Sequence, residues 1–251
     1  MTEPFNEGAY LAALIELHAG VEFKGPGDKD YSRALMAGLP GLPPDPRVAD
    51  LGCGSGVATL LLAEHFGGVV KAVDLCEAFV EDLRCDAAAA GLAGHVEAIC
   101  ADMGALDWPP ASLDLIWSEG AAYNLGFERA LTRWRPLLAP GGLAVISEMS
   151  WFAEERPAAA VEYWQVAYPG MASETENAAH ARRTGFEVLD IRRLPAEAWW
   201  RNYYGPLEAR MGQVERTPAM AAVIEETTME IDLFRRYSDY YGYSFYVLRT
   251  A

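Results

Sequence analysis

The segment that most constrains the fold of this chain runs from residue 46 to residue 56 and reads Pro-Arg-Val-Ala-Asp-Leu-Gly-Cys-Gly-Ser-Gly. Residues 47–51 have the apolar pattern of a short buried strand. Gly52, Gly54 and Gly56 then bring almost no side-chain bulk, and a run of apolar residues typical of a helix follows. A strand that turns on glycines into a helix is a ligand-binding device of doubly wound α/β sheets.

The spacing of these glycines indicates which ligand the turn suits. The dinucleotide fingerprint has the order G-x-G-x-x-G or A, but its sixth position is Val57 when counted from Gly52 and Thr59 when counted from Gly54. The strand also ends on an acidic residue, Asp50. Because a carboxylate beside the turn repels a pyrophosphate, we expect a cationic or hydrogen-bond-donating ligand instead.

Two further predicted strands lead to acidic residues. The second strand ends at Asp74, which lies 74 − 50 = 24 residues after Asp50, where a carboxylate suits ribose hydroxyls. The third strand, 95–101, is followed by Asp102 and Met103. The carboxyl ends of parallel strands meet at one edge of a sheet, so we expect the three carboxylates around one site. A simple cap of the following turn is the alternative role for Asp102.

The run Asp50-Leu51-Gly52-Cys53-Gly54-Ser55-Gly56 resembles motif I of the class I S-adenosylmethionine-dependent methyltransferases. The resemblance covers about residues 45–150 and implies a Rossmann-like, doubly wound α/β fold. Its sheet would have seven mostly parallel strands, with the last strand antiparallel between the fifth and sixth. The implied cofactor is S-adenosyl-L-methionine, in which Asp102 would contact the adenine amino group and Met103 its ring. The expected cofactor-binding residues are Asp50, Gly52, Cys53, Gly54, Gly56, Asp74, Leu75, Asp102, Met103, Ser118 and Glu119.

Two further stretches refine the resemblance. Trp117-Ser118-Glu119-Gly120 and Glu148-Met149-Ser150-Trp151 look like a bacterial subgroup of small-molecule methyltransferases of the quinone-biosynthesis type. The subgroup does not name the acceptor. The chain lacks the Asn/Asp-Pro-Pro-Tyr motif that marks many enzymes methylating amino groups of nucleic acid or protein, so such polymers are disfavoured.

The residues of the acceptor side are predicted from topology. Glu119 follows the fourth strand and is the first candidate for a general base; binding of the cofactor or capping of the next helix are its alternative roles. His18 is a second catalytic candidate, and the alternative is a packed core histidine. We expect five residues to bind the substrate: Tyr31, Tyr123, Asn124, Trp151 and Tyr204.

The chain is expected to form one methyltransferase domain over residues 1–251. Residues 1–45 form an N-terminal helical lid, 46–195 and 241–251 the sheet core, and 196–240 a helical insertion before the last strand. A packed helical pair without a binding role is the alternative for the lid. Pro140-Gly141-Gly142 predicts a turn before the fifth strand, 143–148.

Composition restricts the partners. The formal net charge is −16 and no run of Lys or Arg occurs, which argues against nucleic acid. No apolar stretch reaches the roughly 18 residues of a membrane span, and the first residues lack the pattern of a signal peptide. The four cysteines have no metal-type spacing, so we expect free thiols, no metal and a cytoplasmic location. A homodimer is compatible with these observations.

The sequence therefore predicts an enzyme that transfers a methyl group from S-adenosyl-L-methionine to a small-molecule acceptor by in-line displacement. A non-catalytic cofactor-binding or scaffold module on the same fold is the main alternative. A nicotinamide-dependent oxidoreductase is a weaker one, since the glycine spacing fails from both starting points.

Overall fold

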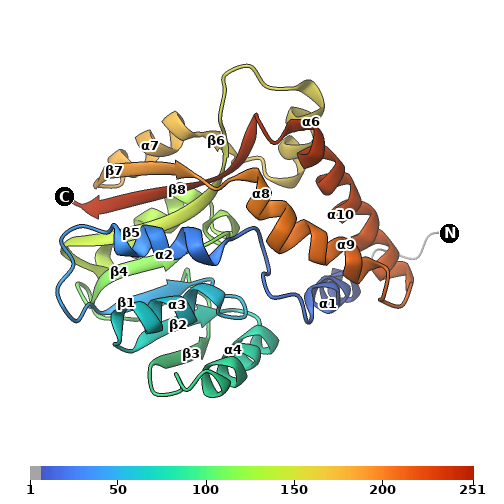
Figure 1. Ribbon diagram of the computed structural model, residues 1–251. Coiled ribbons are helices and arrows are strands. Elements are labelled where there is room, and N and C mark those ends of the chain that lie inside the picture. The colour runs from blue at the N-terminus through green and yellow to red at the C-terminus, as the bar shows by residue number, and fades with distance from the viewer. Residues whose placement is uncertain (1–6) are drawn as a thin grey trace.

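The computed structural model describes residues 7–251, so the first six residues of the expected lid lie outside the described residues. Its centre is a sheet in the order β3-β2-β1-β4-β5-β8-β7, with β6 attached to β5 (Figure 1). The strands are β1 (Val48–Leu51), β2 (Val70–Asp74), β3 (Val96–Cys100), β4 (Leu113–Ser118), β5 (Leu138–Trp151), β6 (Ala172–Ser173), β7 (Phe186–Arg193) and β8 (Tyr241–Thr250).

Helices surround this sheet. They are α1 (Glu7–His18), α2 (Lys29–Ala37), α3 (Val57–Phe66), α4 (Glu77–Ala89), α5 (Phe127–Trp134), α6 (Ala158–Ala167), α7 (Glu174–Arg183), α8 (Ala196–Trp199), α9 (Gly205–Met211) and α10 (Pro218–Tyr237). Two short 3₁₀ turns, η1 (Ala122–Asn124) and η2 (Arg135–Leu137), and a π-helical turn, η3 (Trp200–Tyr204), connect them.

The expected fold class is confirmed. Strands β1 to β5 pair in parallel, whereas β8 runs antiparallel between β5 and β7. Asp50 pairs with Ala72 on one side and with Trp117 on the other, so the carboxyl ends of the three central strands are level. This register places the loops that follow β1, β2 and β4 beside one another.

The structure corrects two details of the sequence prediction. Within residues 7–251 the sheet has eight strands, because the two residues of β6 pair with the end of β5. Pro140-Gly141-Gly142 lies inside β5 as a bulge. Leu113 of β4 pairs with Leu138 of β5, and the next pair joins Leu115 to Leu143, so β5 carries extra residues between the two pairs. Helix α7 begins at Glu174, where Ser173 and Glu176 form a capping box.

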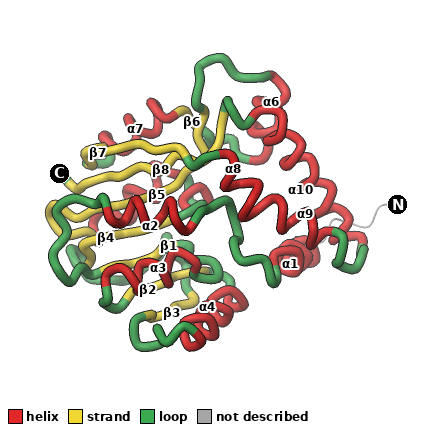
Figure 2. Tube along the Cα trace, viewed as in Figure 1, coloured by secondary structure: helices red, strands yellow, loops and turns green. Residues whose placement is uncertain are grey.

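The core forms two layers, one on each face of the sheet, and Figure 2 shows the strands between the helices. Side chains alternate along each strand, so Leu115 and Val145 face one layer while Ile116 and Ile146 face the other. All four are fully or almost fully buried. The apolar runs of β4 and β5 thus reflect burial on both faces.

The N-terminal segment packs at two places. Helix α2 packs against α3 and is capped by Asp28, whose side chain accepts a hydrogen bond from the Tyr31 amide at 2.9 Å. Helix α1 packs against α9 and α10. Figure 1 shows α1, α9 and α10 beyond the end of the sheet to which the parallel arrows point. Among residues 7–251, no helix has the length and apolar character that crossing a membrane requires.

Candidate functional site

The glycine turn after β1 is tied to β2 through its backbone. The amides of Gly52 and Cys53 both donate to the Val73 carbonyl, at 2.8 and 3.0 Å. The carboxylate of Asp74 accepts from the Gly54 amide at 2.8 Å and from the Cys76 amide at 2.9 Å. Because a carboxylate has about four acceptor sites, Asp74 can hold the turn and still accept from ribose hydroxyls.

Close packing explains why the turn needs glycine. Gly52 has φ of +78°, and a Cβ there would lie 2.2 Å from the Ala121 Cβ and 3.3 Å from the Met103 sulfur. Gly56 has φ of +87°, and a Cβ there would lie 2.2 Å from a methyl carbon of Leu83. Any side chain at either position would both strain the backbone and collide with its neighbours. The turn therefore brings the loops after β1, β3 and β4 into contact.

Asp50 lies beneath this turn and not on its surface. Its side chain is 1% exposed, and one oxygen accepts from the Thr59 hydroxyl at 2.6 Å. Burial raises the pKa of Asp50 to about 7, although the Thr59 hydrogen bond acts in the opposite direction. Cys53 is also buried, and burial raises the pKa of its thiol. Both positions fit a role in shaping the turn.

The ends of β2 and β3 offer apolar side chains beside an exposed carboxylate. Leu75 is 74% exposed directly after Asp74. Asp102 is exposed, and one of its oxygens accepts from the Gly104 amide at 2.7 Å. The Met103 sulfur lies close to Gly52. An apolar wall next to carboxylate acceptors suits a purine nucleoside, so these residues fit the adenosine part of S-adenosyl-L-methionine.

The N-terminal segment lies against the glycine turn. The Ser55 hydroxyl donates to the Glu22 carbonyl at 3.2 Å, and a Cβ on Gly54 would lie 3.3 Å from Lys24. The Lys24 ammonium is itself held by the carbonyls of Val21 and His18, at 2.7 and 3.0 Å. The loop between α1 and α2 thus packs against the turn.

Glu119 sits where β4 meets this segment. One carboxylate oxygen accepts from the Trp117 indole at 2.8 Å and from the Ser32 hydroxyl on α2 at 2.7 Å. Burial raises the pKa of Glu119, and these two hydrogen bonds partly offset that rise. A carboxylate with a raised pKa is a stronger base at neutral pH. Ser32 was not predicted from the sequence, because nothing local relates it to a residue 87 positions away.

The loop after β4 is further held by two serines. Ser118 is completely buried, and its hydroxyl donates to the Leu51 carbonyl at 2.7 Å. The Gly120 amide donates to the Ser147 hydroxyl on β5, also at 2.7 Å. Ser118 therefore joins the ends of β1 and β4 from inside the sheet, while Ser147 is a supporting residue that the sequence prediction missed.

His18 is engaged through both ring nitrogens. Its Nδ1 lies 2.8 Å from the Leu14 carbonyl and its Nε2 lies 3.2 Å from the Tyr203 hydroxyl. Burial lowers the pKa of His18, which favours the neutral ring, with Nδ1–H donating to Leu14 and Nε2 accepting from Tyr203. No hydrogen bond joins His18 to Glu119 among residues 7–251. These contacts favour the packed-histidine alternative.

The five expected substrate residues divide by exposure. Tyr123 is 43% exposed and Asn124 is exposed, whereas Trp151 and Tyr204 are only 4% and 1% exposed. The Tyr31 ring packs on Phe245, and its hydroxyl donates to the Arg193 carbonyl at 3.1 Å. Tyr123 and Asn124 are therefore accessible to a ligand. Trp151 and Tyr204 are packed beneath the surface, and the Tyr31 hydroxyl is already engaged by a backbone carbonyl.

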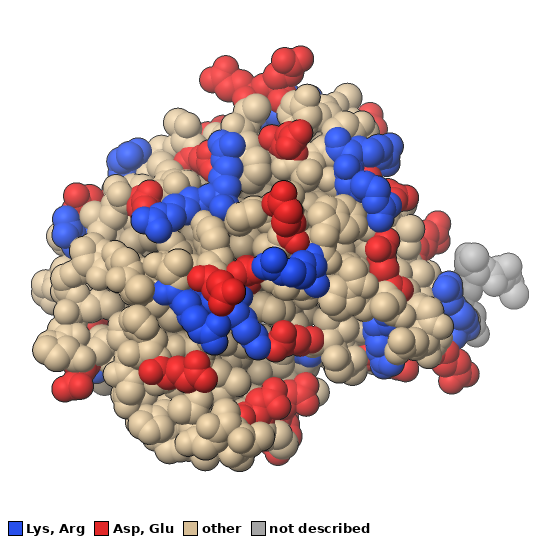
Figure 3. Space-filling view, viewed as in Figure 1, with Lys and Arg blue, Asp and Glu red and all other residues tan. Residues whose placement is uncertain are grey.

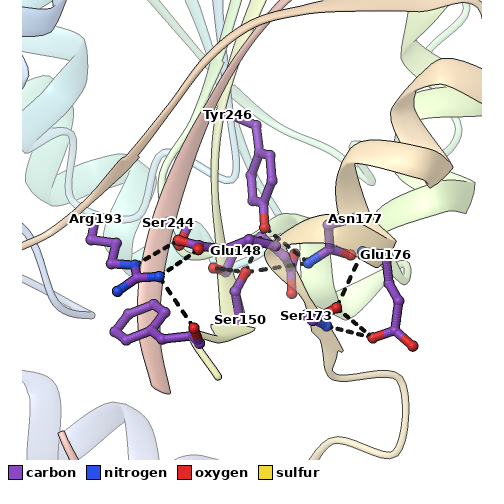
Figure 4. A network of polar contacts seen from close by, with 10 residues as sticks. Glu148, Ser150, Ser173, Glu176, Asn177, Arg193, Ser244 and Tyr246 are labelled. Atoms are coloured by element: carbon purple, nitrogen blue, oxygen red, sulfur yellow. Dashed lines mark hydrogen bonds and ion pairs between the residues drawn. The ribbon is translucent and has the colours of Figure 1, made fainter. Parts of the chain in front are cut away.

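Glu148 on β5 is an acidic residue whose environment the sequence did not reveal. It is 1% exposed, and neither carboxylate oxygen has a hydrogen-bond partner of good geometry among the described residues. Burial raises the pKa of Glu148 to about 8, with Tyr168 acting against it. Its backbone carbonyl accepts from Ser150, whose hydroxyl also contacts Tyr246 and Asn177 (Figure 4). Its sequence signals were its place at the end of the expected fifth strand and in the stretch 148–151.

Comparisons with known proteins find a matching domain and two partly similar methyltransferases. Residues 48–142 match the family described as "Methyltransferase domain". The chain is 29% identical over 168 residues to 24-methylenesterol C-methyltransferase 2 of rice, covering 62% of this chain and 46% of that protein. It is 36% identical over 112 residues to trans-aconitate 2-methyltransferase of Streptomyces coelicolor, covering 43% of this chain and 36% of that protein. The chain thus spans less than half the length of the curated relatives it matches.

A solved structure extends the likeness to the whole fold. The S-adenosylmethionine-dependent methyltransferase of Thiobacillus denitrificans, in complex with S-adenosyl-L-homocysteine, superposes with a TM-score of 0.80 at 22% identity. The match covers 94% of this chain and 97% of that one. Residues 48–142 therefore match a methyltransferase domain, and the whole chain shares the fold of this solved methyltransferase.

Proposed function

We propose that the protein is an enzyme that transfers a methyl group from S-adenosyl-L-methionine to a small-molecule acceptor. The observation that carries this proposal is the glycine turn itself. Its backbone is held by Asp74, it touches Met103 and Ala121, and it lies at the level ends of three parallel strands. Ligands of doubly wound sheets bind at that edge.

Each residue of the site would have a separate role. Asp74 and Asp102 would accept hydrogen bonds from ribose and adenine, with Leu75 and Met103 against the ring. When bound, the cofactor supplies a methyl group activated by a positively charged sulfur. The protein mainly has to hold the acceptor in line with that group in a dry site. Glu119, with its raised pKa, would take the acceptor's proton.

The first test is calorimetric titration with S-adenosyl-L-methionine and, separately, with S-adenosyl-L-homocysteine. We expect micromolar binding of both. A folded protein that binds neither would refute the proposal, because the glycine turn would then serve another ligand.

The second test is Glu119→Gln. Loss of a general base lowers kcat by about 10²- to 10⁴-fold, while binding of S-adenosyl-L-homocysteine should change little. Ser32→Ala is the matched variant, since it keeps the carboxylate and removes one hydrogen bond. That bond lowers the pKa of Glu119, so its removal should raise the pKa. We therefore expect the pH at which activity appears to be higher in Ser32→Ala than in the unaltered chain. Unchanged kcat in Glu119→Gln would remove Glu119 from the catalytic role.

The finer assignments belong to the same proposal. The stretches at 117–120 and 148–151 support the quinone-biosynthesis-like subgroup, without naming the acceptor. The contacts of Glu22 and Lys24 with the turn support a lid within residues 1–45, followed by a sheet core and the insertion at 196–240. The relatives' names point to acceptors as different as a methylenesterol and trans-aconitate, so they do not single out one acceptor.

The proposed partners are small molecules and not nucleic acid. The net charge is −16, and Figure 3 shows basic and acidic side chains interleaved on the face drawn, without an extended basic patch. Nucleic-acid binding depends on such a patch. A cytoplasmic location and a homodimer remain part of the proposal, to be checked by fractionation and by light scattering.

A further inference from the structure

The loop between α1 and α2, residues 19–28, is held at both ends by one short turn of the insertion. This turn is η3, which continues α8 into α9. At the start of the loop, the Tyr203 hydroxyl lies 3.2 Å from Nε2 of His18, the last residue of α1. At its other end, the side-chain amide of Asn202 donates to the Gly27 carbonyl at 2.9 Å. Two adjacent residues of η3 therefore contact the two ends of the α1–α2 loop.

Asp28, the residue that caps α2, makes a further contact with η3. Its side chain is only 10% exposed. One carboxylate oxygen accepts from the Tyr31 amide at 2.9 Å. The other accepts from the Asn202 side-chain amide at 3.0 Å and from the Arg201 guanidinium. Hydrogen bonds between charged groups are stronger than neutral ones, so the Arg201–Asp28 ion pair fastens the end of the loop to η3.

The backbone of η3 departs from a regular helix. It is a π-helical turn, in which the Gly205 amide donates to the Trp200 carbonyl. A Cβ on Gly205 would lie 2.7 Å from that oxygen, so glycine permits the close approach. Side chains at adjacent positions of a regular helix do not face each other, yet those of Arg201 and Asn202 meet at one oxygen of Asp28. Turns of this kind occur frequently at functional sites.

The middle of the α1–α2 loop packs against the proposed cofactor end of the site. The Ser55 hydroxyl donates to the Glu22 carbonyl at 3.2 Å. A Cβ on Gly54 would lie 3.3 Å from Lys24, whose ammonium lies 5.1 Å from the centroid of the Phe79 ring on α4. The loop thus lies between η3 on one side and the glycine turn with α4 on the other.

The end of the same loop reaches the proposed base. A Cβ on Gly27 would lie 3.4 Å from Oε2 of Glu119. The other oxygen, Oε1, accepts from the Ser32 hydroxyl, and the Ser32 amide donates to the Asp28 carbonyl at 2.9 Å. The residue that η3 holds is therefore part of the helix turn that brings Ser32 to Glu119.

We propose that η3 controls release of the cofactor: it holds the α1–α2 loop on the glycine turn, and the Arg201–Asp28 ion pair must open before the cofactor can leave. Arg201 is a positioning residue that acts through Asp28. The Arg201 side chain is 67% exposed, so the pair can open toward solvent at little cost. Loop opening sets the rate of product release in many enzymes. The inference rests on the proposed function and adds a role for the insertion.

The first test measures the dissociation rate of S-adenosyl-L-homocysteine from the full chain by stopped-flow fluorescence. Arg201→Met removes the charge, while Asp28 keeps its hydrogen bond to the Tyr31 amide. Because a hydrogen bond to a charged group is lost, we expect the dissociation rate to rise about fivefold, with little change in the association rate. The midpoint of urea unfolding should stay the same, since the side chain is largely exposed.

Arg216→Met is the matched control, because Arg216 is exposed in the same insertion; it should release S-adenosyl-L-homocysteine like the unaltered chain. Asp28→Asn removes the charge of the other partner and keeps a good helix cap. If the two side chains act as one unit, the double variant releases no faster than Arg201→Met alone. Multiplied effects in the double variant, or a rate in Arg201→Met within about twofold of the unaltered chain, would overturn the inference.

The second test uses amide hydrogen exchange on the chain without any ligand. In Arg201→Met, residues 19–28 should exchange faster than in the unaltered chain, whereas β1 and α3 should exchange at the same rate. Unchanged exchange in residues 19–28 would overturn the inference and leave the proposed function standing. Failure of the unaltered chain to bind S-adenosyl-L-homocysteine would instead remove the proposed function, and the control of release with it.

Discussion

The two ends of the site are built in different ways. The proposed cofactor end consists largely of backbone from the loops after β1 and β2, and its carboxylates lie at or just beyond the ends of their strands. The proposed acceptor end consists of side chains from α1, α2, η1 and η3 and from the loop after β4. The first end depends on what a few adjacent residues allow the chain to do, and the second depends on how distant segments pack. A substitution should therefore act at the first end through the backbone and at the second through charge and shape.

The largest effect is expected at the glycine turn. Gly52→Ala would place a Cβ 2.2 Å from the Ala121 Cβ at a φ of +78°. Overpacking and backbone strain together should cost about 3 kcal/mol of stability. Because the turn itself would move, we also expect affinity for S-adenosyl-L-homocysteine to fall by about 100-fold, or about 2.7 kcal/mol. Urea unfolding and calorimetry measure the two effects.

Gly41→Ala tests the effect of backbone strain without a steric clash. Gly41 has a similar φ of +72°, but a Cβ there would meet nothing within 4 Å. It should lose about 1 kcal/mol from the unfavourable backbone angle and bind the cofactor product normally. If Gly52→Ala behaved like Gly41→Ala, the close approach of the two loops would not be needed for binding.

A smaller effect, dependent on pH, is expected from Glu148. Its pKa of about 8 lies above the ordinary value of 4.5. At a pH below both values, the folded and unfolded states are both protonated. Between them, the unfolded state ionises while the folded state keeps its proton, so the free energy of unfolding falls as pH rises. Above about pH 8 Glu148 is ionised in both states, so it lowers the free energy of unfolding no further.

Glu148→Gln removes this ionisation while keeping the shape of the side chain. Urea unfolding at several pH values between 5 and 8 should therefore show a shallower decline than in the unaltered chain, and a more stable protein at the alkaline end, by an amount on the order of 2 kcal/mol. Asp50, with a pKa of about 7, contributes a similar slope in both proteins. Parallel curves for the two proteins would show that Glu148 is ionised in the folded state.

The smallest effect is expected from Ser118→Ala. Its hydroxyl donates to the Leu51 carbonyl inside the sheet, and loss of one buried hydrogen bond typically costs about 1 kcal/mol. Because Ser118 is completely buried, affinity for S-adenosyl-L-homocysteine should change less than about threefold, or under about 0.7 kcal/mol. A larger loss of affinity without loss of stability would make Ser118 a direct ligand of the cofactor.

Much of the fold could be predicted because the residues that specify it lie close together in the sequence. Glycines at 52, 54 and 56 and the acidic strand ends at 50 and 74 lie close together in the chain, and each is explained by the backbone angle or hydrogen bond that it provides. The bulge at Pro140-Gly141-Gly142 was missed because a turn and a bulge use the same residues. Only the partner strand decides between them.

The acceptor end could be predicted less well. Tyr123 and Asn124 follow β4 and were found by the topology rule, but Trp151 and Tyr204 turned out to be packed behind the surface. No pattern in the sequence relates Ser32 to Glu119 or His18 to Tyr203, which are 87 and 185 residues apart.

The sequence alone determined the sheet, the glycine turn and the kind of ligand that the turn admits, because strand alternation and backbone angles are properties of neighbouring residues. The tertiary structure decided which side chains meet at the acceptor end. It brought Ser32 to Glu119 and Tyr203 to His18. Such contacts depend on the packing of helices that the chain order leaves far apart, and the charge of a buried group has meaning only once its neighbours are in place.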